Sequence, residues 1–211
     1  MTTDPLKEYG RVEEIRNIAQ KLESHEPELY PEDVWDETLD LRIDRLNVDG
    51  DHLPDDRRPY ALAVKSGLYL CNENLDKSHT LSQQITNATG SYWHGIMHRM
   101  EGDYWNSKYW FNRVGRHPVF DGLHAEVRLL LEERLSNAPV GHPRLAAMLR
   151  RLAESRSWEP ELFIDCVELQ VGTARDRQAE PILKAIQRLE LAALLEYSWA
   201  QSFGGSLFNA G

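Results

Sequence analysis

Two histidines four residues apart, His94 and His98, are the residues whose spacing most directly suggests chemistry. At 3.6 residues per turn they project from one face of a helix, together with Glu101. Two imidazoles at this spacing can bind one divalent metal ion, provided that a third ligand comes from Glu101 or from a neighbouring helix, where His79 and His124 are the candidates. The spacing is therefore compatible with a metal site for a divalent transition metal, and the sequence leaves open whether such a cofactor is bound.

The motifs that would assign a reaction to this site are incomplete. A His-Glu-x-x-His protease needs glutamate directly after its first histidine, but position 95 is glycine. Glu-x-x-His, which is typical of ferritin-like di-iron sites, occurs nowhere in the chain. The sequence therefore leaves open whether the protein is an enzyme.

Two other interpretations of the same histidines stay open. In one, they are core-edge residues hydrogen-bonded to Glu101, Asp103 or the backbone. In the other, they are acid–base or ligand-binding groups of a metal-free pocket for a small molecule. The residues predicted to bind that ligand are three aromatic and two basic side chains: Trp93, Tyr104, Trp105, Arg99 and Arg113. Arg116 could join the two other arginines in holding an anion.

The elements that position these residues are expected to be helices. Val12, Ile15 and Ile18 illustrate the helical spacing of apolar residues that recurs along the chain, and no alternating apolar and polar run predicts a strand. We expect an all-α fold, a single-domain irregular bundle of about eight helices with short loops. Asp103 is expected to cap a helix from Tyr104 to Val114, Ser78 to cap the helix that carries His79, and Asp121 to cap a helix over residues 123–135.

Charge divides the chain unequally. Residues 1–56 hold 17 acidic and 6 basic residues, whereas residues 57–211 hold 17 acidic and 18 basic ones. We predict an acidic N-terminal helical extension and linker (1–56), a helical core domain (57–203) and a flexible tail (204–211). The net charge of −10 argues against nucleic-acid binding. The acidic region is interpreted as a solvated surface, with docking on a basic partner as the alternative.

Several features favour a cytoplasmic protein that does not enter membranes. No apolar run reaches the roughly 20 residues that span a bilayer. The sequence Met1-Thr-Thr-Asp-Pro5 lacks the features of a signal peptide. Cys71 and Cys166 stand alone and are expected to be buried, reduced thiols. The sequence leaves open whether the protein forms an oligomer.

The linker around Gly50 partly imitates a calcium-binding EF-hand loop. Asn47, Asp49, Gly50 and Asp56 match four of its positions, but Arg45 stands where the first anionic ligand is required. We therefore interpret this stretch as a turn-rich linker.

One segment carries both a hairpin signature and a resemblance to a family. Residues 101–115 look like the turn and second helix of a tetratricopeptide hairpin, which favours a non-catalytic protein-interaction module as the alternative function. The pattern GSYWHxxxHRxEGDY, followed by YWFxRVGxHP up to Pro118, resembles an uncharacterised family of helical bacterial and fungal proteins. That resemblance implies a helical fold and supports the choice of segment, but it implies no activity.

Overall fold

The computed structural model describes residues 5–48, 53–137 and 139–208. Within these ranges the chain forms ten α-helices and one short π-helical segment, and no strand. The all-α prediction is confirmed. The number of helices is ten rather than about eight, and two of them, α2 and α4, have only eight residues each.

The helices follow one another with short connections. The first five are α1 (Pro5–Glu23), α2 (Glu37–Asp44), α3 (Arg58–Cys71), α4 (Leu75–Ser82) and α5 (Ala88–Met100). The others are α6 (Tyr104–Val114), α7 (Val119–Asn137), α8 (Pro143–Glu154), α9 (Pro160–Leu169) and α10 (Ala179–Ser202), with the π-helical segment Gln170–Ala174 before α10.

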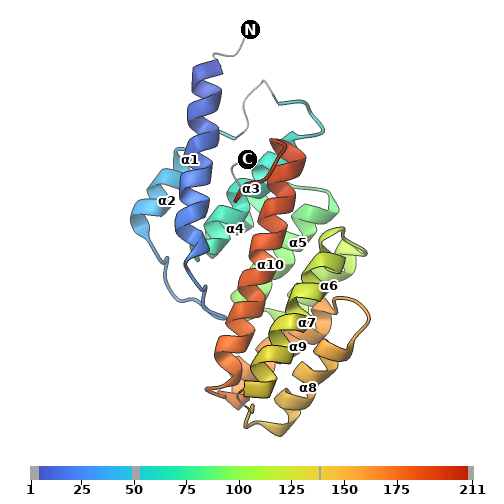
Figure 1. Cartoon of the computed structure of the whole chain (residues 1–211). Coiled ribbons are helices and arrows are strands. Elements are labelled where there is room, and N and C mark those ends of the chain that lie inside the picture. Colours follow the sequence, from blue (N-terminus) through green and yellow to red (C-terminus); the bar gives the residue numbers. More distant parts are fainter. Residues whose placement is uncertain (1–4, 49–52, 138, 209–211) are drawn as a thin grey trace.

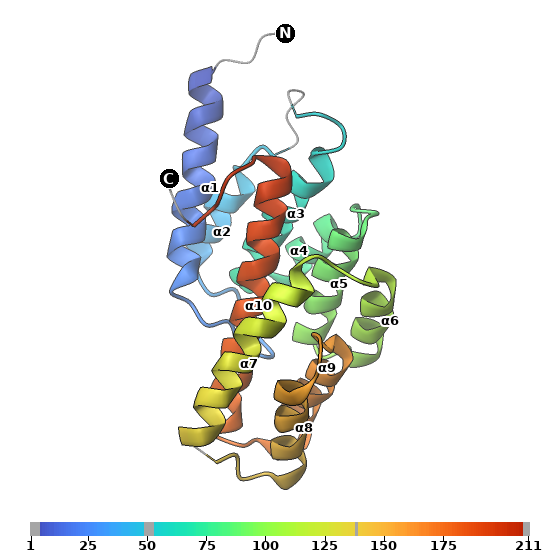
Figure 2. The same ribbon diagram turned by 45° about the vertical axis from the view of Figure 1, so that its right-hand side comes forward.

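The long helix α10 runs through the middle of the molecule and packs on α3 and α7 (Figures 1 and 2). Helices α1 and α2 lie beside its C-terminal half, and α7, α8 and α9 gather around its N-terminal half. No helix of the described residues is long and apolar enough to cross a membrane.

Helix α5, which carries the two central histidines, lies deep in the protein. Asn87 caps it by accepting a hydrogen bond from the Gly90 N–H, and every residue from Thr89 to Met100 is buried. Gly95 allows α6 to approach closely, because a Cβ at this position would lie 2.8 Å from the ring of Phe111. The two histidines are therefore held by a buried, closely packed part of the core.

Of the three predicted helix caps, one is confirmed and two are wrong. Asp103 caps α6 as predicted, by accepting a hydrogen bond from the Asn106 N–H. The prediction for Ser78 is wrong: Asn74 caps α4, and Ser78 is buried inside that helix. The prediction for Asp121 is also wrong, because α7 already begins at Val119, whose N–H donates to the ring of His117.

The N-terminal quarter shares its core with the rest of the chain. Ile18 and Ile43 belong to the same hydrophobic cluster as Val64 of α3. The predicted division at residue 56 stays a prediction. In the predicted tail, Leu207 is buried, and residues 209–211 lie outside the described residues. Asp49 and Gly50, from the stretch that partly matches an EF-hand loop, also lie outside the described residues.

Candidate metal centre

Three histidine rings meet where α4 packs on α5. His79 comes from α4, whereas His94 and His98 come from successive turns of α5. The ring centroid of His94 lies 4.7 Å from that of His79 and 4.7 Å from that of His98, and the His79 and His98 centroids are 5.5 Å apart. One nitrogen of each ring lies within 4.8 Å of the other two, so the three side chains could share one metal ion.

His94 is the most enclosed of the three. Its Nδ1 is buried and has no hydrogen-bond partner among the described residues. The indole of Trp110 covers the ring, with 4.0 Å between the centroids. Burial, reinforced by the nearby rings of His98 and His79, lowers the pKa of His94 to about 3. The imidazole is therefore neutral at physiological pH, which is the form that binds metal ions.

His98 lies between the histidine cluster and the end of α5. Its Nδ1 is hydrogen-bonded to the carboxylate of Glu101, the residue that follows the last turn of the helix. A carboxylate partner of this kind commonly orients a metal-binding imidazole. The amide Nδ2 of Asn106 lies 3.0 Å from Nε2 of His98, so this amide competes with a cation for that nitrogen. His98, Glu101 and Asp103 also bring their ligand atoms within 4.8 Å of one another.

The remaining metal candidate, His124, lies elsewhere. It belongs to α7, and its Nε2 is 3.1 Å from the carbonyl oxygen of Ser155. Helix α7 packs on α8 and α10 rather than on the histidine cluster. Of the two candidates from other helices, the structure therefore brings His79, and not His124, next to His94 and His98.

The five residues predicted to line a ligand pocket occupy different environments. Trp93 is fully buried, and its indole N–H donates to Ser198 of α10. Arg99 is also fully buried and forms an ion pair with Glu190. Trp105 is 78% exposed.

The last two of the five residues lie on α6. Tyr104 is half-buried, and its hydroxyl has no partner among the described residues. Arg113 is exposed, and its guanidinium lies 5.3 Å from the centroid of the Trp110 ring. The prediction that the five side chains line one ligand site stays a prediction. Arg116, the further anion candidate, forms its ion pair with Asp121 at 3.6 Å.

Two residues of the site, Asn106 and Trp110, were not found by sequence reasoning. Both lie on α6, and they contact His98 and His94, respectively. The signal that could have found them is the turn at Gly102. In an antiparallel hairpin centred on that residue, position 98 faces position 106 and position 94 faces position 110.

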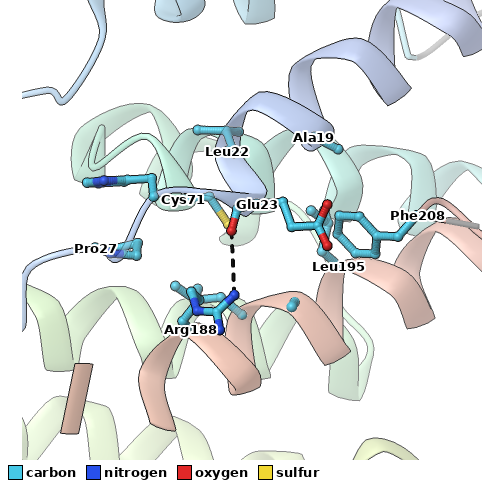
Figure 3. A pocket seen from close by; sticks show the side chains of 11 residues that line it. Ala19, Leu22, Glu23, Pro27, Cys71, Arg188, Leu195 and Phe208 are labelled. Atoms are coloured by element: carbon cyan, nitrogen blue, oxygen red, sulfur yellow. Dashed lines mark hydrogen bonds between the residues drawn. The ribbon is translucent and has the colours of Figure 1, made fainter. Parts of the chain in front are cut away.

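A small pocket occurs at a different place, between the end of α1, the end of α3 and the middle of α10 (Figure 3). Its cavity of about 30 Å³ has room for only a few water molecules. Arg188 points into it, and Nη1 of Arg188 lies 3.5 Å from the carbonyl oxygen of Glu23. None of the predicted site residues lines this pocket.

No family model matches the sequence, and neither the curated proteins nor the solved structures give a match. The resemblance to a family of helical proteins therefore stays an expectation, and the function must be argued from the site.

Proposed function

We propose that this protein binds a divalent transition-metal ion through His79, His94 and His98. The observation that carries the proposal is the convergence of three imidazoles from two helices, with Nδ1 of His94 buried and unpaired. Burying an unpaired polar nitrogen destabilises a fold by about 1–3 kcal/mol, and coordination of a cation would remove part of that cost.

The arrangement suits a metal better than it suits packing alone. Three adjacent imidazoles repel one another when they are protonated, so the pKa of His94 is lowered first by burial and then by His98 and His79. In a tetrahedral zinc site the ligand nitrogens are about 3.3 Å apart, so these side chains need to move by only about an ångström or two. Three histidine ligands leave one position of such a site open to water or to a second ligand.

The donor set indicates the kind of metal. Imidazole nitrogen favours Zn²⁺, Cu²⁺, Ni²⁺ and iron over Mg²⁺ or Ca²⁺, which prefer oxygen ligands. The contact between Glu101 and His98 would fix the ring orientation of His98 and make it a stronger ligand. The proposal covers binding of the metal ion and of a small molecule at the open coordination position. It assigns no reaction.

Elemental analysis and titration calorimetry with ZnCl₂ test this function. We expect one equivalent of metal per chain. Loss of an outer-shell partner typically weakens metal binding by about 10–100-fold. His94→Gln and His79→Gln remove direct ligands and should weaken zinc binding by more than that. His124→Gln is the matched control and should bind zinc as the wild type does. The proposal fails if the wild type binds no zinc, copper, nickel, iron or manganese, or if the control loses as much affinity as the other two variants.

A second candidate function, a non-catalytic interaction module, is favoured by the exposed face of α6. Trp105 is 78% exposed and stacks on Tyr109, which is 45% exposed. Large exposed aromatic side chains often mark contact surfaces. Sedimentation of the wild type and of Trp105→Ser over a range of concentrations tests self-association through this face. Association that the variant loses supports the module, whereas identical sedimentation of both proteins contradicts it.

A further inference from the structure

The connection between α1 and α2, together with the first turn of α2, carries negative charge that the rest of the structure does not neutralise. Between residues 26 and 40 there are seven acidic residues and no lysine or arginine. Three of the seven form ion pairs with lysines elsewhere: Glu28 with Lys184, Asp36 with Lys21, and Asp40 with Lys77. The other four are exposed and have no ion pair within the described part of the chain: Glu26, Glu32, Asp33 and Glu37.

Two aromatic side chains, Tyr30 and Trp35, lie between these carboxylates in the sequence, and each packs on another part of the protein. Trp35 is 42% exposed, and one face of its indole stacks on the ring of His25 at 4.0 Å. Tyr30 is 49% exposed and packs on Gly102, where a Cβ would lie 2.9 Å from Cε2 of the tyrosine ring. Each ring therefore packs against the protein and still exposes part of its surface to solvent.

Buried groups of the core hold the backbone of this loop in one shape. Asn72, which is fully buried, accepts a hydrogen bond from the Trp35 N–H at 3.1 Å and donates one to the Asp36 carbonyl at 3.0 Å. The carboxylate of the buried Glu73 accepts a hydrogen bond from the Glu28 N–H at 2.6 Å. Glu73 itself has a φ of 63°, a left-handed conformation that is unfavourable for a residue with a side chain. Strain of this kind persists where the surrounding structure requires a particular geometry.

We propose that this acidic aromatic loop, formed by Tyr30, Trp35 and the four unpaired carboxylates, docks an arginine-rich segment of a partner protein. Guanidinium groups stack on indole rings and form bidentate hydrogen bonds with carboxylates, so they match both kinds of group that the loop exposes. Because the loop is held rigidly before binding, little conformational entropy is lost on docking. The surface contains none of the three histidines of the proposed metal site, and the proposal does not depend on metal.

A fluorescently labelled oligoarginine peptide probes the charges of this surface. The test variant is Glu32→Gln/Asp33→Asn/Glu37→Gln. The control is Glu126→Gln/Glu133→Gln/Glu154→Gln, which removes the same charge from exposed positions of α7 and α8. Anisotropy titrations should show at least about tenfold weaker binding for the loop variant and less than about twofold for the control, with affinity falling as salt increases. Equal losses in both variants, or no binding by the wild type, would overturn the proposal.

A second variant tests the aromatic part. Trp35→Leu should lower the affinity for oligoarginine by about two- to fivefold, the range of an exposed cation–π contact. It should affect an oligolysine peptide of the same length less, because lysine lacks the planar group that stacks on indole. An equal effect on the two peptides would contradict the role of Trp35. Circular dichroism establishes that each variant is folded. His94→Gln should bind the peptide normally, which keeps this test independent of the metal site.

Discussion

The indole of Trp110 lies almost flat on the imidazole of His94, with 4.0 Å between the ring centroids and 14° between the ring planes. The two residues belong to the two helices of the α5–α6 hairpin. Since His94 is the central ring of the histidine cluster, a cation bound there would lie close to this indole.

Metal binding should therefore change the fluorescence of Trp110. Titration with Cu²⁺, which quenches nearby indoles, is expected to lower the emission of the wild type in proportion to site occupancy. Trp110→Phe should lose most of this response. Trp105→Phe serves as the control because Trp105 is exposed on the same helix, and it should keep the response. If both variants respond alike, the quenched tryptophan is another of the six in the chain.

The buried ion pair between Arg99 and Glu190 should be essential for stability. Nη2 of Arg99 lies 2.6 Å from Oε2 of Glu190, both side chains are fully buried, and the hydroxyl of Tyr92 donates to Oε1 of the same carboxylate. Arg99→Met leaves this carboxylate without its cation, and such losses destabilise proteins by about 3–5 kcal/mol. Urea denaturation measures the change in the free energy of unfolding.

Two comparisons make that result specific. The double variant Arg99→Met/Glu190→Leu should recover much of the lost stability, because it leaves no unpaired buried charge. Breaking the exposed pair between Arg128 and Glu132 should cost no more than about 1 kcal/mol. A double variant as unstable as the single one would contradict this account.

Stability should fall as the pH decreases below 6.5. Burial lowers the pKa of His117 to about 4 from its ordinary value of 6.5, and that of His94 to about 3. Between these values and 6.5 the unfolded chain binds more protons than the folded protein does. Each histidine therefore lowers the free energy of unfolding by at most about 1.4 kcal/mol per pH unit in this window. Above pH 6.5 neither contributes.

Urea denaturation at several pH values checks this dependence. His117→Gln removes one of the two groups and should make the curve of unfolding free energy against pH shallower between pH 6.5 and about 4. Trp105→Phe, which changes an exposed side chain without a titratable group, is the control and should keep the wild-type slope. Equal slopes in all three proteins would show that His117 is not responsible.

The sequence predicted the parts of the site that depend on local geometry. His94 and His98 share a face because helix geometry places residues four apart together. It could not choose between His79 and His124, since that choice depends on which helix packs against α5. It also grouped Trp93 with His94, although neighbouring residues on a helix point about 100° apart. In the structure Trp93 points toward α10, and the tryptophan that stacks on His94 is Trp110 of α6.

The helices show the same division between local and distant causes. Asp103 was identified as a cap because its side chain reaches an N–H only three residues away. Asp121 was assigned wrongly because α7 already begins at Val119, whose N–H donates to the ring of His117. A histidine ring that accepts a hydrogen bond at the start of a helix is an uncommon signal, because serine, threonine, aspartate and asparagine are the preferred residues there.

A pair of helical glycines provides the last prediction, on the packing of the α5–α6 hairpin. A Cβ at Gly95 would lie 2.8 Å from the ring of Phe111, whereas a Cβ at Gly122 of α7 would meet no atom within 4 Å. Gly122→Ala should raise the free energy of unfolding by about 0.5–1 kcal/mol, because alanine favours the helix. Gly95→Ala should lower it by about 1–3 kcal/mol, since Phe111 must shift and α6 with it. Because Trp110 is on α6, Gly95→Ala should also weaken the copper-dependent quenching. A stabilised Gly95→Ala protein with unchanged quenching would contradict the close packing of α5 on α6 at this position.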